Sequence, residues 1–143
     1  MEICIMESAE RFRVVIECKC ADADVMRLKS HIALFEHRLA AEQDGEKVFV
    51  DTADVLYFES VDDATFLYTE SAVLEIKKRL YELETALSER SFLRISKSVV
   101  VHLQKVVSLR PQLNRTILAT MTNGEKLVIS RSYVKKLRSI LPH

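Results

Sequence analysis

From Lys47 to Ile129 the sequence is a series of short apolar runs separated by polar turns. Several runs alternate apolar and polar residues, which is the period of a β-strand. One run, Val55-Leu56-Tyr57-Phe58-Glu59, is almost continuously apolar and predicts a strand buried on both faces. This part of the chain is therefore expected to fold mainly as strands. The predicted strands are 47–50, 54–59, 64–69, 73–76, 99–103, 106–109, 116–121 and 126–129.

A polar bend interrupts the apolar stretch Phe92–Leu103. Arg94, Ser96, Lys97 and Ser98 lie close together between two apolar segments. Small hydroxyl groups and cations on one short exposed segment are the groups that bind a phosphate backbone. The bend is therefore a candidate contact for a polyanion.

Two turn signals stand between predicted strands. The first contains Asn123-Gly124, the strongest short signal of a β-hairpin. The second is Asp62-Asp63, between the strands 54–59 and 64–69. A carboxylate pair also suits acid–base or metal chemistry, but no histidine or third acid accompanies it, so a turn role is favoured.

Three segments have helical periodicity. The first begins near Asp22 or Asp24, either of which can cap it, and runs to about Ala41. Its apolar residues have heptad spacing, which predicts either packing within the chain or a helix–helix dimer contact. They are Val25, Leu28, Ile32, Phe35 and Leu39. The second helix is 77–87, and the third is 131–141, with Ser130 as its N-cap.

The N-terminal segments Met1–Met6 and Val14–Cys20 are β-prone and flank the polar turn Ser8–Arg11, which predicts a hairpin. Cys18 and Cys20 would share one face of a strand. Because no further ligands stand nearby, they are interpreted as packing residues and not as metal ligands.

The formal net charge of zero conceals a division of charge along the chain. Residues 1–89 hold 10 Lys and Arg against 20 Asp and Glu, whereas residues 90–143 hold 11 against 1. The C-terminal part therefore attracts a polyanion, unless the two parts neutralise each other in the fold. The polar segment Ala40–Glu46 is the expected boundary, giving an extension at 1–44 and a domain at 45–143.

Composition and motifs exclude several classes of protein. No stretch reaches the roughly 18 apolar residues of a membrane span, and the N-terminus lacks the basic region of a signal peptide. Three cysteines near one end favour free thiols in a reducing cytoplasm. The sequence has no Gly-rich phosphate loop, metal-ligand cluster or nucleophile–base motif, so neither enzyme activity nor a cofactor is expected.

Four pieces of the chain, in this order and spacing, resemble the LytTR DNA-binding domain. They are 54–60 (DVLYFES), 78–84 (KRLYELE), 92–103 and 128–137 (VISRSYVKKL). The resemblance implies a mostly β fold with a few helices (α+β), made of short antiparallel strands in small sheets, to which the N-terminal hairpin and helix are added. It also implies a bacterial regulator of transcription whose loops enter successive major grooves of double-stranded DNA.

The resemblance also bears on partners. Many family members carry a phosphoacceptor receiver domain, for which about 45 residues are too few. Short stand-alone members are typically controlled by a small membrane protein. The segment before residue 45 is therefore the expected place for homodimerisation or for such a regulator.

Family contacts fall on three positions of this chain. The polar bend supplies Lys97, with Ser96 and Ser98 beside it. The start of the last helix supplies Arg131 and Ser132, whereas Ser130 is better explained as an N-cap. The loop between strands 54–59 and 64–69 offers only Thr65, because its two carboxylates would repel phosphate. The candidate DNA-binding residues are Lys97, Arg131, Ser96, Ser98, Ser132, Lys135, Arg94 and Thr65.

The chemistry of two candidates supports these roles independently. Arg131 can donate two hydrogen bonds to guanine O6 and N7, worth about 1–3 kcal/mol of discrimination. Lys97 is a point charge that suits phosphate or a single guanine acceptor. The alternative function is non-specific binding of RNA or DNA, but the chain's aromatic residues lie mostly in apolar runs and offer no stacking platform.

Overall fold

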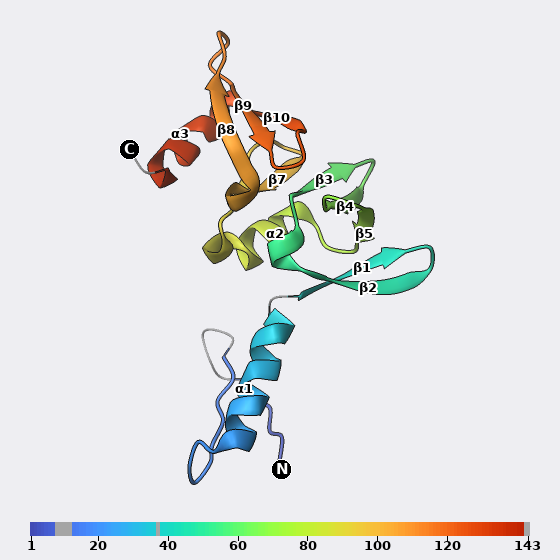
Figure 1. The fold of residues 1–143 in the computed structure, drawn as a ribbon, viewed down its shortest axis with the longest axis vertical. Coiled ribbons are helices and arrows are strands. Elements are labelled where there is room, and N and C mark those ends of the chain that lie inside the picture. Colours follow the sequence, from blue (N-terminus) through green and yellow to red (C-terminus); the bar gives the residue numbers. More distant parts are fainter. Residues whose placement is uncertain (8–12, 37, 142–143) are drawn as a thin grey trace. The chain divides into compact units, whose positions relative to one another are not determined.

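Two hydrogen-bonded sheets carry most of the secondary structure in the computed structural model, which describes residues 1–7, 13–36 and 38–141 (Figure 1). Contacts divide the chain into two units, with the division after Glu36. The first unit contains the helix α1 (Ala23–Glu36). Asp22 caps this helix, because the Val25 N–H donates to its Oδ1 at 3.0 Å.

The larger sheet belongs to the second unit and has the strand order β2-β1-β5-β4-β3-β7-β6. Every neighbouring pair is antiparallel. Its strands are β1 (Arg38–Gln43), β2 (Glu46–Asp51), β3 (Tyr57–Val61), β4 (Ala64–Tyr68), β5 (Val73–Ile76), β6 (Phe92–Arg94) and β7 (Val99–His102). A 3-10 turn, η1 (Thr52–Asp54), precedes β3, and the helix α2 (Leu80–Ala86) and the 3-10 turn η2 (Ser88–Arg90) connect β5 to β6.

The smaller sheet has the order β10-β9-β8 and follows the 3-10 turn η3 (Leu103–Lys105). Its strands are β8 (Val106–Pro111), β9 (Ile117–Met121) and β10 (Lys126–Ile129). The helix α3 (Arg131–Ile140) begins directly after β10. Ile117 and Ile129 are register partners, so the start of α3 lies beside the turn between β8 and β9 (Figure 1).

The core consists of two apolar clusters that meet at β3 and the residues leading into it. Val55 and Phe58 pack in one cluster with Leu83 of α2. Leu56 and Tyr57 pack in the other, together with Leu137 of α3. The predicted burial of this strand on both faces is therefore confirmed.

A buried histidine lies where β7 meets the segment before β3. His102 is 3% exposed, and its ring stacks on Phe92 with 4.3 Å between ring centroids. Its Nδ1 is 2.8 Å from the carbonyl oxygen of Val55, and a carbonyl can only accept, so Nδ1 carries the proton. Burial lowers the pKa of His102, which favours the neutral ring.

The predicted fold class, mostly β with a few helices, is confirmed. Both turn predictions are confirmed as well. Gly124 adopts φ 88° in the turn between β9 and β10. Asp62 and Asp63 have φ values of 49° and 66° between the paired residues Val61 and Ala64, which is the geometry of a primed two-residue hairpin turn.

The predicted N-terminal hairpin is wrong in the described residues, because neither 1–7 nor 13–22 contains a strand. The predicted turn at Ser8–Arg11 lies outside the described residues. Apolar side chains such as Ile3 and Val15 are 81% and 65% exposed, so pairing here would bury little apolar surface. Cys18 and Cys20 are exposed, which contradicts the interpretation that they are packing residues.

The predicted end of the first helix is also wrong. The helix ends at Glu36, and Leu39 lies on β1, where it pairs with Val50 and is 8% exposed. Leu39 satisfies the heptad pattern by spacing alone, whereas the alternating burial of 38–41 follows the period of a strand. The contact boundary therefore falls after Glu36, and the predicted boundary at 44/45 lies inside the turn between β1 and β2.

Candidate nucleic-acid interface

The bend between β6 and β7 is a closed turn. The Ile95 N–H donates to the Val99 carbonyl at 3.0 Å, and the Ser98 N–H donates to Ser96 Oγ at 3.2 Å. The hydroxyl groups of Ser96 and Ser98 face each other at 3.5 Å, and Lys97 between them is exposed. The turn thus presents one cation and two hydroxyl groups, a set that suits phosphate oxygens.

Arg94 holds this turn from behind. Its Nε donates to the Ser96 carbonyl at 2.7 Å, and its Nη2 donates to the Lys97 carbonyl at 2.5 Å. Its Nη1 lies 3.5 Å from Glu84 of α2, and the Arg94 side chain is only 17% exposed. The guanidinium is therefore engaged within the protein, and its geometry favours positioning of the bend over contact with a ligand.

The start of α3 lies directly beside the bend. The Ser130 N–H donates to the Ile95 carbonyl at 2.9 Å, so the two segments are joined through their backbones. Arg131, Ser132 and Lys135 are exposed on the helix. Ser130 occupies the N-cap position as predicted, but its side chain makes no capping bond and instead lies 3.3 Å from Ser132 Oγ. Unpaired N–H groups and hydroxyls at a helix start favour an anion.

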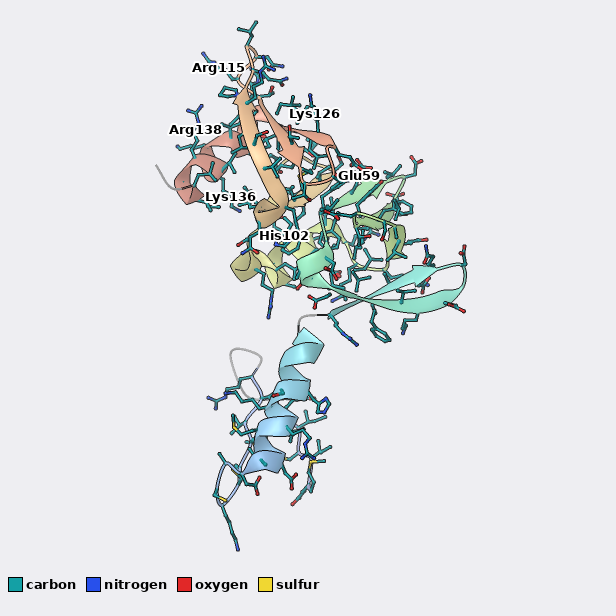
Figure 2. The ribbon with its side chains drawn as sticks, in the orientation of Figure 1. Glu59, His102, Arg115, Lys126, Lys136 and Arg138 are labelled. Atoms are coloured by element: carbon teal, nitrogen blue, oxygen red, sulfur yellow. The ribbon has the colours of Figure 1, made fainter. Side chains whose placement is uncertain are left out.

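A groove runs from α3 to the turn between β8 and β9. Two cations in it were not among the sequence candidates, namely Arg115 in that turn and Arg138 on α3 (Figure 2). Among the described residues, no acid lines the groove. Its lining residues are Pro111, Gln112, Arg115, Thr116, Ser130, Arg131, Ser132, Val134, Lys135 and Arg138.

The one acid of residues 90–143, Glu125, is held by groups outside this groove. The hydroxyl of Tyr57 on β3 donates to Glu125 Oε2 at 2.6 Å, and Asn123 Nδ2 donates to Oε1 at 3.1 Å. Burial, and then the bond to Glu125, raise the pKa of Tyr57, so its hydroxyl keeps its proton. The carboxylate is therefore engaged by donors outside the groove and is not among the residues that line it.

The turn between β3 and β4 does not offer the donor that the sequence assigned to it. Thr65 lies on β4 and is 7% exposed, so its hydroxyl is not available at the surface. Asp62 and Asp63 are exposed in its place. Thr65 is therefore not a surface contact, whereas Ser96–Ser98 and the start of α3 lie on segments joined by the Ser130–Ile95 bond.

The described residues contain neither a metal-ligand cluster nor a membrane-spanning helix. Within the described ranges, no group of three or more histidine, cysteine, aspartate or glutamate side chains could hold a metal ion. No helix in the same ranges combines the length and apolar character that a membrane crossing requires.

Comparison with known proteins places these features in a family. A family model described as the LytTr DNA-binding domain matches residues 45–142. The solved LytTr DNA-binding domain of a putative methyl-accepting/DNA response regulator from Bacillus cereus superposes with a TM-score of 0.71. That structure is 27% identical, and the match covers 75% of this chain and 98% of that one.

Relatives by sequence include a sensory transduction protein and a transcriptional regulator. Sensory transduction protein LytT of Bacillus subtilis is 27% identical over 123 residues, which are 86% of this chain and 51% of the relative. An uncharacterized HTH-type transcriptional regulator of Staphylococcus aureus strain NCTC 8325 is 30% identical over 105 residues, covering 73% and 71% of the two chains. The chain thus spans about half the length of the Bacillus subtilis relative.

Proposed function

The chain belongs to the LytTR DNA-binding domain family, and on that premise we propose that it is a sequence-specific transcriptional regulator that binds double-stranded DNA. The observation that carries the proposal is that the exposed bend 96–98 and the exposed basic residues at the start of α3 lie on neighbouring segments. The Ser130–Ile95 backbone bond joins these two parts, and no acid in the described part of the chain lines the adjoining groove. Such a surface suits a duplex that carries one negative charge per about 1.7 Å of its axis.

Within this surface the residues divide by chemistry. Arg131 is exposed at the first position of α3 and suits bidentate bonding to guanine in the major groove. Lys97, Ser96 and Ser98 suit phosphate oxygens, which fix the register of the protein without specifying sequence. Lys135 lies one helical turn after Arg131 and extends the phosphate contact along α3.

The test is fluorescence anisotropy binding to the DNA upstream of the protein's own gene and to a shuffled duplex, across a salt series. We expect the native sequence to bind more tightly at moderate salt. Equal and steeply salt-dependent binding to both duplexes would instead support the alternative, a non-specific nucleic-acid-binding module.

Three variants sharpen this test. Arg131→Ala is expected to cost about 1–3 kcal/mol on the preferred duplex and little on the shuffled one. Lys97→Ala should weaken both complexes and reduce the slope of log K against log salt by about 0.9. Lys47→Ala is the control, because Lys47 is an exposed cation on β2. This strand forms one edge of the larger sheet, and β7 lies next to the other edge. Binding by Arg131→Ala and Lys97→Ala at the wild-type level would refute both assignments.

We further propose that α1 mediates homodimerisation. Val25, Leu28 and Ile32 form a partly exposed apolar stripe, and Met26 beside it is 48% exposed. A second copy of α1 could cover this stripe, although so short a seam requires support from the rest of the protein. A small membrane-protein regulator is the other occupant that the family suggests.

Multi-angle light scattering tests the dimer. The wild type should have the mass of a dimer, Leu28→Asp the mass of a monomer, and Lys29→Asp, which changes an exposed neighbour, the mass of a dimer. A monomeric wild type would refute homodimerisation and leave the stripe to a different partner.

A further inference from the structure

The turn between β8 and β9 places a leucine in full contact with solvent. Leu113 is 108% exposed, the highest value among the exposed large hydrophobic side chains of the described residues. A single exposed leucine is common and carries no argument by itself. Its surroundings make this one informative.

The turn is closed by hydrogen bonds. The Gln112 N–H donates to the Thr116 carbonyl at 2.9 Å, and the Arg115 N–H donates to the Gln112 carbonyl at 3.2 Å. The Thr116 hydroxyl lies 2.7 Å from Gln112 Oε1 and 2.5 Å from Asn114 Oδ1. Leu113 therefore projects from a turn that is closed by backbone and side-chain bonds, and its exposure does not come from an unstructured loop.

The side chain shares a hollow with cations of the proposed DNA surface. Leu113, Asn114, Arg115, Thr116 and Arg131 line this hollow, and no acid is among them. The pairing of β9 with β10 brings the hollow beside α3, as described above. A ligand for this place must carry negative charge and also offer an apolar group.

Duplex DNA offers both. Its phosphates match Arg115, and the 5-methyl group of thymine is the apolar group that it displays in the major groove. Arg131, the residue proposed to bind guanine in that groove, lines the same hollow as Leu113. We propose that Leu113 contacts a thymine methyl group next to the guanine bound by Arg131, and so adds a base preference to the operator. This inference rests on the proposed function.

The experiment compares thymine with uracil, which lacks the methyl group. The probe is the duplex that the wild-type protein selects from a randomised pool, with each thymine replaced in turn by deoxyuridine. We expect the wild type to lose about fourfold in affinity at one or two positions, equivalent to about 0.8 kcal/mol for one buried methyl group. Leu113→Ala should bind the thymine duplex about as weakly as the wild type binds the uracil duplex. Replacing thymine by uracil should not weaken binding of this variant further.

A matched control and two outcomes decide the matter. Val107→Ala removes another exposed side chain, 62% exposed on β8, and should keep the wild-type response to uracil. If the wild type selects a duplex but no uracil substitution weakens binding, or if Leu113→Ala stays sensitive to uracil, the thymine contact is refuted while the proposed function stands. If no duplex is selected, the proposed function itself fails.

Discussion

Replacing Arg94 by methionine distinguishes a positioning role from a phosphate contact. Methionine keeps the length and the apolar stem of the side chain but removes every donor. Two charge-assisted bonds, to the carbonyls of Ser96 and Lys97, are lost with the guanidinium. Bonds to charged groups contribute about 1.5–3 kcal/mol each, and the lower figure applies here because both carbonyls lie near the surface, where water can replace the donor.

The expected loss in the free energy of unfolding is therefore about 3 kcal/mol from these two bonds. The Glu84 contact adds little, since it is 3.5 Å long and partly exposed, and such pairs contribute about 0–1 kcal/mol. Urea denaturation followed by circular dichroism measures this loss. Lys97→Met is the control and should change stability by less than about 0.5 kcal/mol, as exposed substitutions usually do.

DNA binding by the same two proteins completes the comparison. Lys97→Met should reduce the salt slope by about 0.9 with wild-type stability. Arg94→Met should also bind DNA more weakly, because the bend that carries Lys97 loses its support. Wild-type stability in Arg94→Met, combined with a salt slope lower by about 0.9, would refute the positioning role and make Arg94 a phosphate contact.

Three further substitutions test individual contacts. His102→Leu should reduce the loss of unfolding free energy at acid pH. Because the pKa of His102 is lowered in the fold, the wild type has its full stability above about pH 6.5 and loses stability as the pH falls below that value. A variant whose unfolding free energy, measured by urea titration, depends on pH as the wild type's does would contradict this. Tyr57→Phe removes the bond to Glu125 and should lower the free energy of unfolding by about 1.5 kcal/mol, measured by urea denaturation; no loss would mean that the bond adds nothing net. Asp62→Asn keeps a residue type that tolerates positive φ and removes a carboxylate from the turn after β3, a strand whose Ser60 N–H donates to the Ser98 carbonyl of the bend at 2.8 Å, so affinity for DNA should rise about threefold. Asp44→Asn, in another positive-φ turn, should leave the affinity unchanged, and equal effects of the two substitutions would refute the assignment.

The features that sequence analysis predicted correctly depend on neighbouring residues. Asn123-Gly124 specifies its turn locally, because glycine adopts positive φ at no steric cost. The apolar run around Phe58 predicts its own burial by composition, and the predicted strand 73–76 matches β5. These elements needed no knowledge of their partners.

The features that it missed depend on residues distant in sequence. By spacing alone, Leu39 fits a helical stripe. Only its pairing with Val50 shows that it lies on a strand. Arg115 joins the cationic groove only because β9 pairs with β10 beside α3, and its signals were a turn position and the basic excess of residues 90–143. The bond from Arg94 to the Ser96 carbonyl forms because the chain turns back over the guanidinium. The sequence shows only a charged residue near two serines and does not reveal this turn.

The backbone bond between Ser130 and Ile95 has a consequence for the operator. Lys97 and Arg131 are not on separate arms connected by a linker, because this 2.9 Å bond ties their segments together. One inserted base pair moves a site by about 3.4 Å along the duplex and turns it by about 35°. The protein could follow that displacement only by breaking the junction between its bend and its last helix. Under the proposed function, the fold itself therefore fixes how far along the duplex the phosphate held at the bend lies from the guanine bound by Arg131.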